Sequence, residues 1–342
     1  MKIDLNGNAE QGCYRWAIVG YGHVAVAHTE GIMHNRMRLV GFSTSNPTIR
    51  NGDATGLEFN IGPTQGREFT TNGMICVASA ETLLSQAYSK ADGVIICAPT
   101  SEHVRLAKEV AITGMDCFLE KPIAPTAAEA RDLIEFWKDK RGKLVVGQVL
   151  PAFPEFGLLR RLLIFKGVNN VTRLSMERFV PWGDTDDEVG NRAKGGAAPD
   201  LGIYDVHLLR SVAKIGSVNV IDQIKRYGLP QRLKMEITME GAMVPFTVHV
   251  GAQRGRKGFH HGYNVEFIDG TNVTFDGQDV RVVHGHAIDA PAKRSVGEIF
   301  GEELDIAVKH FRSTNDSVKS AAYLAPEMAA DALDVLENAA AA

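Results

Sequence analysis

The sequence predicts an α/β domain with a doubly wound parallel sheet, followed by an α+β domain with an open, mainly antiparallel mixed sheet. Up to about residue 148, short apolar runs alternate with amphipathic stretches, which is typical of parallel strands joined by helices. The first run enters a glycine-containing turn that opens a helix. After residue 150, β-rich segments separated by turn signals such as Asp269-Gly270 replace this alternation.

The length and composition favour two globular domains. The chain has 342 residues, 44% of them hydrophobic, which is enough apolar material for two cores. The pattern changes at Leu150-Pro151-Ala152-Phe153-Pro154. We therefore place the first domain at residues 1–150 and the second at residues 151–342, and we expect that the last helices can pack back on the first domain.

Charge and cysteine content narrow the choice of partner and compartment. The 37 basic and 41 acidic residues are mixed along the chain and give a net charge of -4, so we expect neither nucleic acid nor membrane as a partner. The four cysteines form no CxxC pair, which favours a reducing compartment. The N-terminus is polar, and no stretch approaches the roughly 18 apolar residues of a membrane span. We therefore expect a cytoplasmic protein.

Six apolar runs predict the strands of the first domain. They are Trp16–Val19, Leu39–Phe42, Met74–Val77, Val94–Ala98, Cys117–Leu119 and Leu144–Val146. A helix over Val24–Met33 follows the first run. The pattern Thr126-Ala-Ala-Glu129 is typical of a capping box, which satisfies amide donors at a helix start, and predicts a helix over Thr126–Lys138.

The second domain is predicted to contain a helix, a strand, a loop and then one largely antiparallel sheet. The helix is Glu155–Lys166, and the loop, rich in Gly and Asp, is Trp182–Ala198. Strands are expected at Val218–Arg226, Leu233–Met239, Val244–Val250, Tyr263–Ile268 and Val280–Val283. Helices at Glu298–Phe311 and Glu327–Glu337 close the chain.

The turn after the first strand indicates a dinucleotide site of the Rossmann type. It reads Gly20-Tyr21-Gly22-His23-Val24-Ala25, a G-x-G-x-x-A pattern. Such glycines let backbone amides approach a pyrophosphate, and a helix N-terminus favours its negative charge. The pattern alone also occurs in ordinary strand-to-helix turns, but its position at the first strand favours cofactor binding by Gly20, Gly22, His23 and Val24.

The end of the second strand indicates which nicotinamide cofactor is used. A carboxylate there would hold the ribose 2′-hydroxyl of NAD, but the sequence has Ser43-Thr44-Ser45-Asn46, with Arg50 close behind. Without an acid to repel a 2′-phosphate, NADP is favoured over NAD, and Ser43, Thr44, Ser45 and Arg50 are the predicted ribose-side residues. Alternatively, Thr44 or Asn46 bonds a ribose hydroxyl and the protein takes either cofactor.

Further cofactor residues are predicted where the fourth, fifth and sixth strands end, because ligands of open α/β sheets bind at the carboxyl edge. They are Ala98, Pro99, Thr100, His103, Glu120, Lys121 and Gln148. Lys121 belongs beside the nicotinamide on this reasoning. Position alone is also compatible with an ordinary solvated loop lysine.

A second polar group is predicted on one helical face. In Asp200-Leu-Gly-Ile-Tyr204-Asp-Val-His207 the spacing i, i+4, i+7 places Asp200, Tyr204 and His207 on the same side of a helix. They can form a catalytic and substrate-binding site, or a half-buried face satisfied by its neighbours. The preceding Gly195-Gly196 and Pro199 fit a loop and a helix start.

Several other polar residues are weaker candidates. Trp182 can cover the nicotinamide and contact substrate, or pack on its own domain. The strand residues His260, His261 and Tyr263 can line a cleft, although alternating polar residues usually form a solvated or interface face. His284 and His286 lack a third ligand of credible spacing, so we expect no zinc site.

These motifs together resemble the glucose-fructose oxidoreductase, inositol dehydrogenase and MocA (Gfo/Idh/MocA) family. They are Gly20-Tyr-Gly-His-Val-Ala, Pro99-Thr-Ser-Glu-His103, Glu120-Lys-Pro122 and Gly195-Gly196 with Asp200-x-Gly-x-Tyr204-x-x-His207. The similarity spans about residues 15 to 340. It includes Glu302-Glu-Leu-Asp-Ile-Ala-Val and the closing helix Pro326–Glu337.

The resemblance implies a Rossmann domain, an α+β domain whose outer sheet face forms a homodimer or homotetramer, and hydride transfer at a carbinol or carbonyl carbon of a sugar, inositol or related polyol. It implies that Lys121 is the motif lysine and that Asp200 and Tyr204 form the acid/base site. The second of these positions is often histidine in the family. A free tyrosine is a poor base at neutral pH, but a nearby ammonium favours its ionised form.

The choice between Tyr204 and His207 as the acid/base stays open at this stage. In the favoured interpretation Tyr204 moves the hydroxyl proton, while Asp200 and His207 orient the substrate. Two other functions compete with a dehydrogenase: redox-assisted glycoside cleavage with tightly bound NAD, and a non-catalytic dinucleotide sensor. Three site groups, Lys121, Asp200 and Tyr204, argue against the sensor.

Overall fold

The computed structural model describes residues 2–59, 64–182, 196–283, 290–313 and 319–342. The chain divides into two compact units. Unit 1 contains Met1–Ala152 and Arg294–Ala329, and unit 2 contains Phe153–Lys293 and Ala330–Ala342. The C-terminal helical region is therefore divided between the units: Arg294–Ala329 belongs to unit 1 and Ala330–Ala342 to unit 2.

Unit 1 is built on a six-stranded parallel sheet in the order β5-β2-β1-β6-β7-β8. The strands are β1 (Arg15–Val19), β2 (Arg38–Ser43), β5 (Ile75–Val77), β6 (Gly93–Ile96), β7 (Asp116–Leu119) and β8 (Leu144–Val146). The strand order reverses between β1 and β6, because β2 lies on one side of β1 and β6 on the other. This is the arrangement of a doubly wound sheet, as the sequence predicted.

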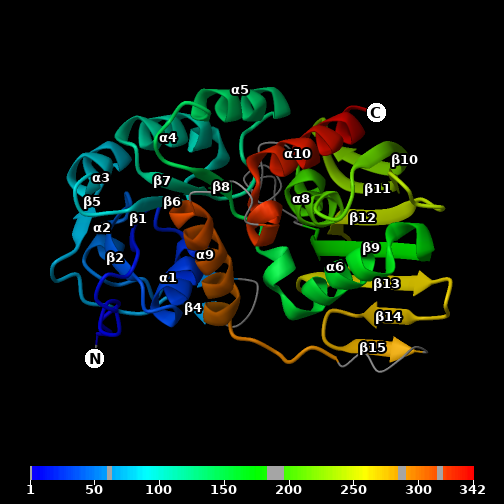
Figure 1. The fold of residues 1–342 in the computed structure, drawn as a ribbon, viewed down its shortest axis with the longest axis horizontal. Helices are drawn as coiled ribbons and strands as arrows, with labels where there is room; N and C mark the ends of the chain where they lie inside the picture. The colour runs from blue at the N-terminus through cyan, green and yellow to red at the C-terminus, as the bar shows by residue number, and fades with distance from the viewer. Residues whose placement is uncertain (1, 60–63, 183–195, 284–289, 314–318) are drawn as a thin grey trace. The chain divides into compact units, whose positions relative to one another are not determined.

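Helices cover both faces of this sheet (Figure 1). On one face lie α3 (Ala80–Ala87), α4 (Thr100–Thr113) and α5 (Ala127–Trp137), and on the other lie α1 (His23–His34) and α9 (Val296–Arg312). Shorter elements are α2 (Pro47–Arg50), η1 (Leu150–Ala152), η3 (Lys319–Leu324) and the ribbon of β3 (Glu58–Phe59) and β4 (Thr64–Gln65). The strands are mostly apolar, as expected of a sheet that helices cover on both faces.

Side-chain caps define the starts of α5 and α9 in unit 1. Thr126 caps α5, as predicted, with its hydroxyl oxygen accepting from the Glu129 amide at 3.2 Å. A reciprocal capping box that the sequence interpretation missed starts α9, where Ser295 and Glu298 satisfy each other's amides. These caps fix where each helix begins relative to the strand before it.

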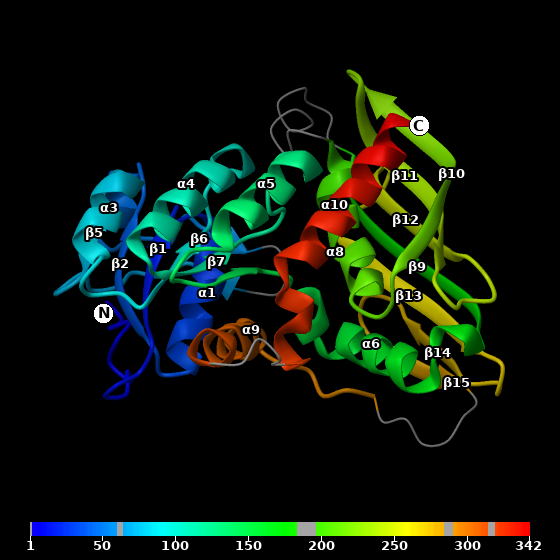
Figure 2. The ribbon, with the colours of Figure 1, turned by 45° about the horizontal axis from the view of Figure 1, so that its top comes forward.

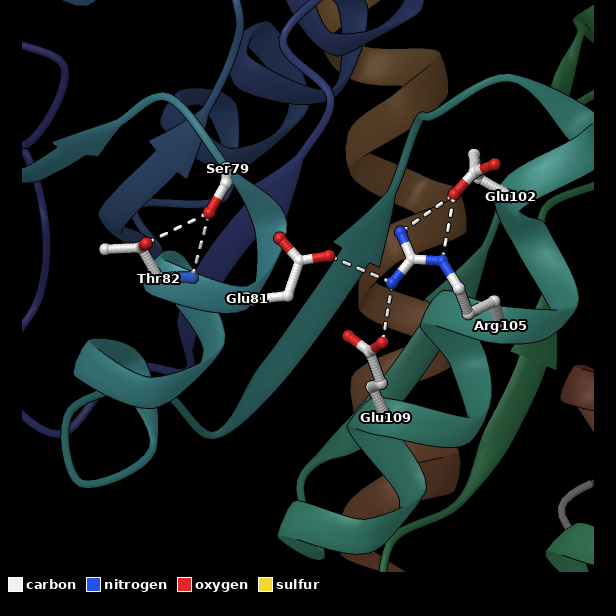
Figure 3. A network of polar contacts seen from close by, with 6 residues as sticks. All are labelled: Ser79, Glu81, Thr82, Glu102, Arg105 and Glu109. Atoms are coloured by element: carbon white, nitrogen blue, oxygen red, sulfur yellow. Dashed lines mark hydrogen bonds and ion pairs between the residues drawn. The ribbon is translucent and has the colours of Figure 1, made fainter.

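An ion-pair network joins α3 to α4 (Figure 3). The Arg105 guanidinium donates to Glu102 and Glu109 on its own helix and to Glu81 on α3, at 2.6 to 2.9 Å. Ser79 caps α3 through the amide of Thr82. Each pair is exposed and contributes little by itself, so the network mainly fixes how the start of α4 lies against α3.

Unit 2 is a seven-stranded sheet in the order β10-β11-β12-β9-β13-β14-β15, with one parallel neighbour pair, β12 and β9. The strands are β9 (Val171–Pro181), β10 (Ile215–Arg226), β11 (Leu229–Met239), β12 (Phe246–Gln253), β13 (His260–Phe267), β14 (Asn272–Phe275) and β15 (Val280–Val283). This confirms the predicted open, mainly antiparallel mixed sheet.

One face of this sheet packs against helices (Figure 2). They are α6 (Pro154–Lys166), α8 (Ala197–Arg210) and the C-terminal part of α10 (Pro326–Ala341), with η2 (Val168–Asn170) after α6. Leu233, Met235 and Ile237 of β11 are all fully buried at alternate positions. The core of unit 2 therefore lies between the sheet and these helices.

Candidate functional site

The turn between β1 and α1 leaves no room for a side chain at its first glycine. Gly20 has φ +84°, and a Cβ placed on it would lie 2.9 Å from the backbone of Cys97 and Ala98. The amides of Gly20 and Tyr21 both donate to the Ser43 carbonyl oxygen, at 3.1 and 2.9 Å. The turn is thus held between the ends of β2 and β6, at the point where the strand order reverses.

The second glycine of this turn faces open space. A Cβ on Gly22 would meet no atom within 4 Å, and Gly22 is the N-cap of α1 without a side-chain cap. The first turn of α1 contains no acidic residue, and His23 and Val24 are at least partly exposed. Open space in front of uncapped amides and a positive helix end suits a pyrophosphate.

The predicted ribose segment follows β2. The Ser43 side chain is buried, whereas Ser45 is exposed. The Arg50 guanidinium donates to the carbonyl oxygens of Thr44 and Ser45 at 2.7 and 2.9 Å, so it lies on this loop. Asn46 caps α2 by accepting from the Thr48 amide. The segment presents hydroxyls and one cation to a ligand, and its residues 43 to 50 include no carboxylate.

His103 joins two of the predicted loops. Its buried ring lies with Nδ1 2.7 Å from the Pro122 carbonyl oxygen and Nε2 2.9 Å from the Ala98 carbonyl oxygen. Burial lowers the pKa of His103, although both carbonyls favour the charged ring. The predicted loop residues Pro99 and Thr100 lie at the start of α4, and both remain partly or fully exposed. His103 therefore ties the β6 loop to the loop that carries Lys121.

Glu120 holds the loop that carries Lys121 in place through two hydrogen bonds. One carboxylate oxygen accepts from His28 Nε2 of α1 at 2.6 Å, and the other accepts from the Lys121 amide at 3.1 Å. Burial alone would raise the pKa of Glu120, but His28 and the Lys121 ammonium outweigh burial and hold the pKa below its usual range. Lys121 itself is partly exposed. The hydrogen bonds of Glu120 to His28 and to the Lys121 amide thus fix the backbone from which the Lys121 side chain projects.

Gln148 and Glu303 form a second buried polar group beside this pair. The backbone amide of Gln148 donates to Glu303 Oε1 of α9 at 2.6 Å, and both residues are at most 1% exposed. Neither the Gln148 side-chain amide nor Glu303 Oε2 has a hydrogen-bond partner in the described part of the chain. Burial, and then the charge of Glu120, raise the pKa of Glu303 well above its usual range. Glu303 therefore keeps its proton to higher pH than an ordinary carboxyl group.

The raised pKa of Glu303 predicts a pH-dependent stability. The folded protein keeps a proton that the unfolded chain releases above the ordinary carboxyl pKa, so stability falls as pH rises towards the folded pKa. Glu303→Gln removes this loss. We expect denaturant unfolding of this variant to gain stability over the parent as pH rises above the ordinary carboxyl pKa, by up to about 1.4 kcal/mol per pH unit.

Glu302→Gln is the matched control, because Glu302 lies on the same helix and is 42% exposed in its pair with Arg294. Its pH dependence should follow that of the parent. Parallel curves for the parent and Glu303→Gln would show that Glu303 is ionised in the folded state.

In unit 2, Asp200, Tyr204 and His207 lie on α8 as predicted, but at different depths. Asp200 and Tyr204 are partly exposed, whereas His207 is 1% exposed. Neither ring nitrogen of His207 has a hydrogen-bond partner in the described residues. Burial, with the nearby Arg160 and Arg210, lowers the pKa of His207 to about 3. His207 is thus a neutral core side chain near pH 7, and Asp200 and Tyr204 are the two more exposed residues of this helical face.

The weaker candidates have ordinary structural surroundings. Trp182 lies under the Arg254 guanidinium, 5.4 Å from the ring centre. His260 pairs with Glu177 across β13 and β9. The buried Tyr263 hydroxyl donates to the Glu155 carbonyl oxygen at 2.9 Å. Gly195, His284 and His286 lie outside the described residues.

Sequence reasoning missed three buried charged or polar side chains: His28, Glu303 and Arg178. Each lies at a position where the apolar pattern of its own helix or strand places a buried residue. Arg178, for example, shares the inner face of β9 with Leu174 and Met176, all buried. A charged residue at a core position of an apolar pattern is the signal that could have found them, because burying it requires a partner.

The geometry of unit 1 defines a class of protein. A parallel sheet that reverses order at β1, a glycine turn without space for side chains and an uncapped helix N-terminus together form a dinucleotide-binding Rossmann domain. Residues 14–148 match the model of the GFO_IDH_MocA family, "Oxidoreductase family, NAD-binding Rossmann fold". The match covers less than half of the chain and agrees with the resemblance predicted from its motifs.

Curated relatives agree with this family. Inositol 2-dehydrogenase from Rhizobium meliloti is 25% identical over 197 residues, 57% of this chain and 54% of that protein. The rhizopine catabolism protein MocA from Rhizobium meliloti is 28% identical over 120 residues, 35% of this chain and 37% of that protein. The matched part of the chain thus spans about half or less of the length of these relatives.

Solved structures share the fold over nearly the whole chain. UDP-N-acetylglucosamine 3-dehydrogenase GnnA from Acidithiobacillus ferrooxidans has a TM-score of 0.71 at 16% identity, covering 97% of each chain. An oxidoreductase from Agrobacterium radiobacter, in complex with NAD+, L-tartaric acid and magnesium, has a TM-score of 0.75 at 13% identity, covering 96% of each chain. Both units of the protein therefore have counterparts in known structures.

Proposed function

We propose that the protein is an NAD(P)-dependent oxidoreductase that acts on a carbinol or carbonyl carbon of a sugar, inositol or related polyol. The observation that carries this proposal is the Glu120-Lys121-Pro122 loop, anchored by His28 and His103 at the carboxyl edge of a Rossmann sheet of this family. Relatives named as dehydrogenases of inositol and of a UDP-sugar support the substrate class.

The cofactor is proposed to bind at the carboxyl edge of unit 1. The amides of the Gly20–Val24 turn would hold the pyrophosphate, the Ser43–Arg50 segment the adenosine ribose, and the β6 and β7 loops the nicotinamide side. A bound nicotinamide supplies the site that accepts or donates hydride. Lys121 is proposed to bind the substrate oxygen through its ammonium.

The proton of the substrate hydroxyl is proposed to move through the phenol oxygen of Tyr204. Tyr204 is partly exposed, whereas His207 is buried with a pKa of about 3 and so does not hold a proton near neutral pH. Asp200 stands one helical turn before Tyr204 and is proposed to orient the substrate.

A screen of sugars, inositols and keto sugars with both cofactors tests this function. We expect nicotinamide absorbance to change in proportion to product for at least one substrate. Lys121→Ala and Tyr204→Phe should each lower turnover by about 100-fold or more, because a positioned proton donor or acceptor contributes about that much. Cofactor binding should stay largely intact in both variants.

His207→Leu is the comparison that separates the two acid/base candidates. Because His207 is buried and neutral, we expect this variant to keep most of the turnover. Loss of turnover in a folded His207→Leu variant, together with full activity of Tyr204→Phe, would refute the assignment. Release of sugar from glycosides without net absorbance change would favour redox-assisted cleavage instead.

We propose further that NADP is preferred over NAD. The supporting observation is the segment after β2, where Arg50 lies on the loop carbonyls and exposed hydroxyls replace a carboxylate. Ser45→Asp places a negative charge in this exposed position. We expect it to weaken NADPH binding by about tenfold or more, because like charges repel, while NADH binding changes little.

Fluorescence titration with NADPH and NADH measures this change. Thr48→Asp is the matched control, because Thr48 is also exposed and its replacement by aspartate adds the same charge on α2. Equal effects of Ser45→Asp on both cofactors would contradict the preference for NADP.

We also propose a cytoplasmic homodimer or homotetramer. Among the described residues, no helix is long and apolar enough to cross a membrane. The four cysteines are free thiols, which suits a reducing compartment. The sheet face opposite α8 displays half-buried polar residues such as Lys234 and Glu236 of β11, and we propose that it forms the subunit interface. Sedimentation velocity of the purified chain tests the subunit number.

A further inference from the structure

Arg178 carries a charge into the core of unit 2. It lies on β9 at the face that packs against the helices, and its side chain is 1% exposed. Burying a guanidinium is costly unless its donors are satisfied, so its partners show what the charge is used for. The proposed proton transfer does not use Arg178 directly.

The partner of Arg178 is the residue directly after Tyr204. Arg178 Nε and Nη2 donate to the two carboxylate oxygens of Asp205 at 3.0 and 2.9 Å, and Asp205 is also 1% exposed. Two parallel hydrogen bonds fix both distance and orientation. The pair therefore locks α8 onto β9 at residue 205, one position from the proposed acid/base.

Aromatic rings enclose the guanidinium. Its central carbon lies 5.2 Å from the ring centre of Tyr204, 5.3 Å from that of Phe156 and 5.9 Å from that of Phe259. A cation over an aromatic face is attracted to the ring, most strongly when both are away from water. The same side chain thus contacts the Tyr204 ring and holds the backbone beside it.

His261 of β13 completes the surroundings of Arg178. Its Nδ1 lies 3.5 Å from Arg178 Nη1, and because arginine can only donate, Nδ1 accepts and the proton sits on Nε2. Burial, with the charge of Arg178, lowers the pKa of His261 to about 3. His261 is therefore a neutral acceptor that satisfies a third donor of the guanidinium.

We propose that Arg178 is the positioning residue of Tyr204, which it holds by the ring face directly and by the backbone through Asp205. This inference rests on the proposed role of Tyr204 as the acid/base. The arrangement does two things for the phenol: it restricts the orientation of the ring, and it places a fixed positive charge over the ring whose hydroxyl must ionise.

Among the described groups of unit 2, Arg178 is a cation placed over the Tyr204 ring. The helix of Tyr204 also carries the carboxylates of Asp200 and Asp205, the neutral His207 and Arg210, which is paired with Asp331, and β13 contributes the neutral His261. The strands β11 and β12 pack apolar side chains against α8. Asp205 offsets part of the charge of Arg178, so its effect on the phenol is moderate.

The experiment observes Tyr204 directly by NMR of the full chain labelled with ¹³C at the tyrosine ring carbon that bears the hydroxyl. The Tyr204 signal is assigned by its loss in Tyr204→Phe. The test variant is Arg178→Met/Asp205→Leu, which replaces the pair by apolar side chains, because removing one partner alone would leave a buried charge. We expect the titration midpoint of Tyr204 to rise by about one pH unit in this variant.

Two further variants separate positioning from general packing. Arg210→Met/Asp331→Leu removes another ion pair of α8, with α10, and should leave the Tyr204 midpoint unchanged. Arg178→Lys keeps the charge and should hold the midpoint near that of the parent. With an active substrate, the test variant should lower kcat by about tenfold and shift its pH profile to higher pH, with little change in KM.

An unchanged Tyr204 midpoint in a folded Arg178→Met/Asp205→Leu protein would overturn the proposal, as would an equal shift in the Arg210 control. If the test variant does not fold, Arg178→Gln/Asp205→Asn takes its place, because it removes both charges and keeps polar partners: a raised Tyr204 midpoint supports the proposal, and an unchanged one overturns it. The NMR titration needs no substrate, so failure of the proposed function would appear in the turnover screen instead.

Discussion

The close approach of the β1 turn to the ends of β2 and β6 is the constraint on which unit 1 depends. Because the strand order reverses between β1 and β6, the turn at Gly20 must fit against the backbone of Cys97 and Ala98, with its amides on the Ser43 carbonyl. Only a residue without a side chain fits there. The same packing points the free N-terminus of α1 at the edge of the sheet, where a dinucleotide can bind.

Buried charges in both units are arranged so that each has a partner or is neutral. Glu120 is hydrogen-bonded to His28, Arg178 is paired with Asp205, and burial favours the protonated form of Glu303. In each case the buried group lies next to a proposed functional residue rather than in contact with solvent. Such pairs contribute little net stability, but they fix orientation, and this is what a site assembled from several elements requires.

Much of the fold could be predicted from the sequence, because the apolar runs of unit 1 and the alternating strands of unit 2 have clear periods. The strand ends then indicated the cofactor edge and the Lys121 loop. The depth of individual side chains could not be predicted. His207 shares a helical face with Tyr204 in sequence spacing, yet it is buried, because burial depends on which neighbours pack over that part of α8. Likewise, Arg178 looks like an exposed charged strand residue unless its spacing of four from Leu174 is noted, which places both side chains on the same face of β9.

The central claim is that the turn after β1 binds a nicotinamide dinucleotide, and Gly22→Asp tests it most directly. A Cβ at this position meets no neighbour, and aspartate is a favourable N-cap, so the variant should fold with an unchanged or higher melting temperature. Its carboxylate would occupy the place of the pyrophosphate. Fluorescence titration with NADPH and NADH should show saturable binding to the parent and at least about tenfold weaker binding to the variant. Absence of binding to the parent, or equal affinity in both proteins, would contradict the account.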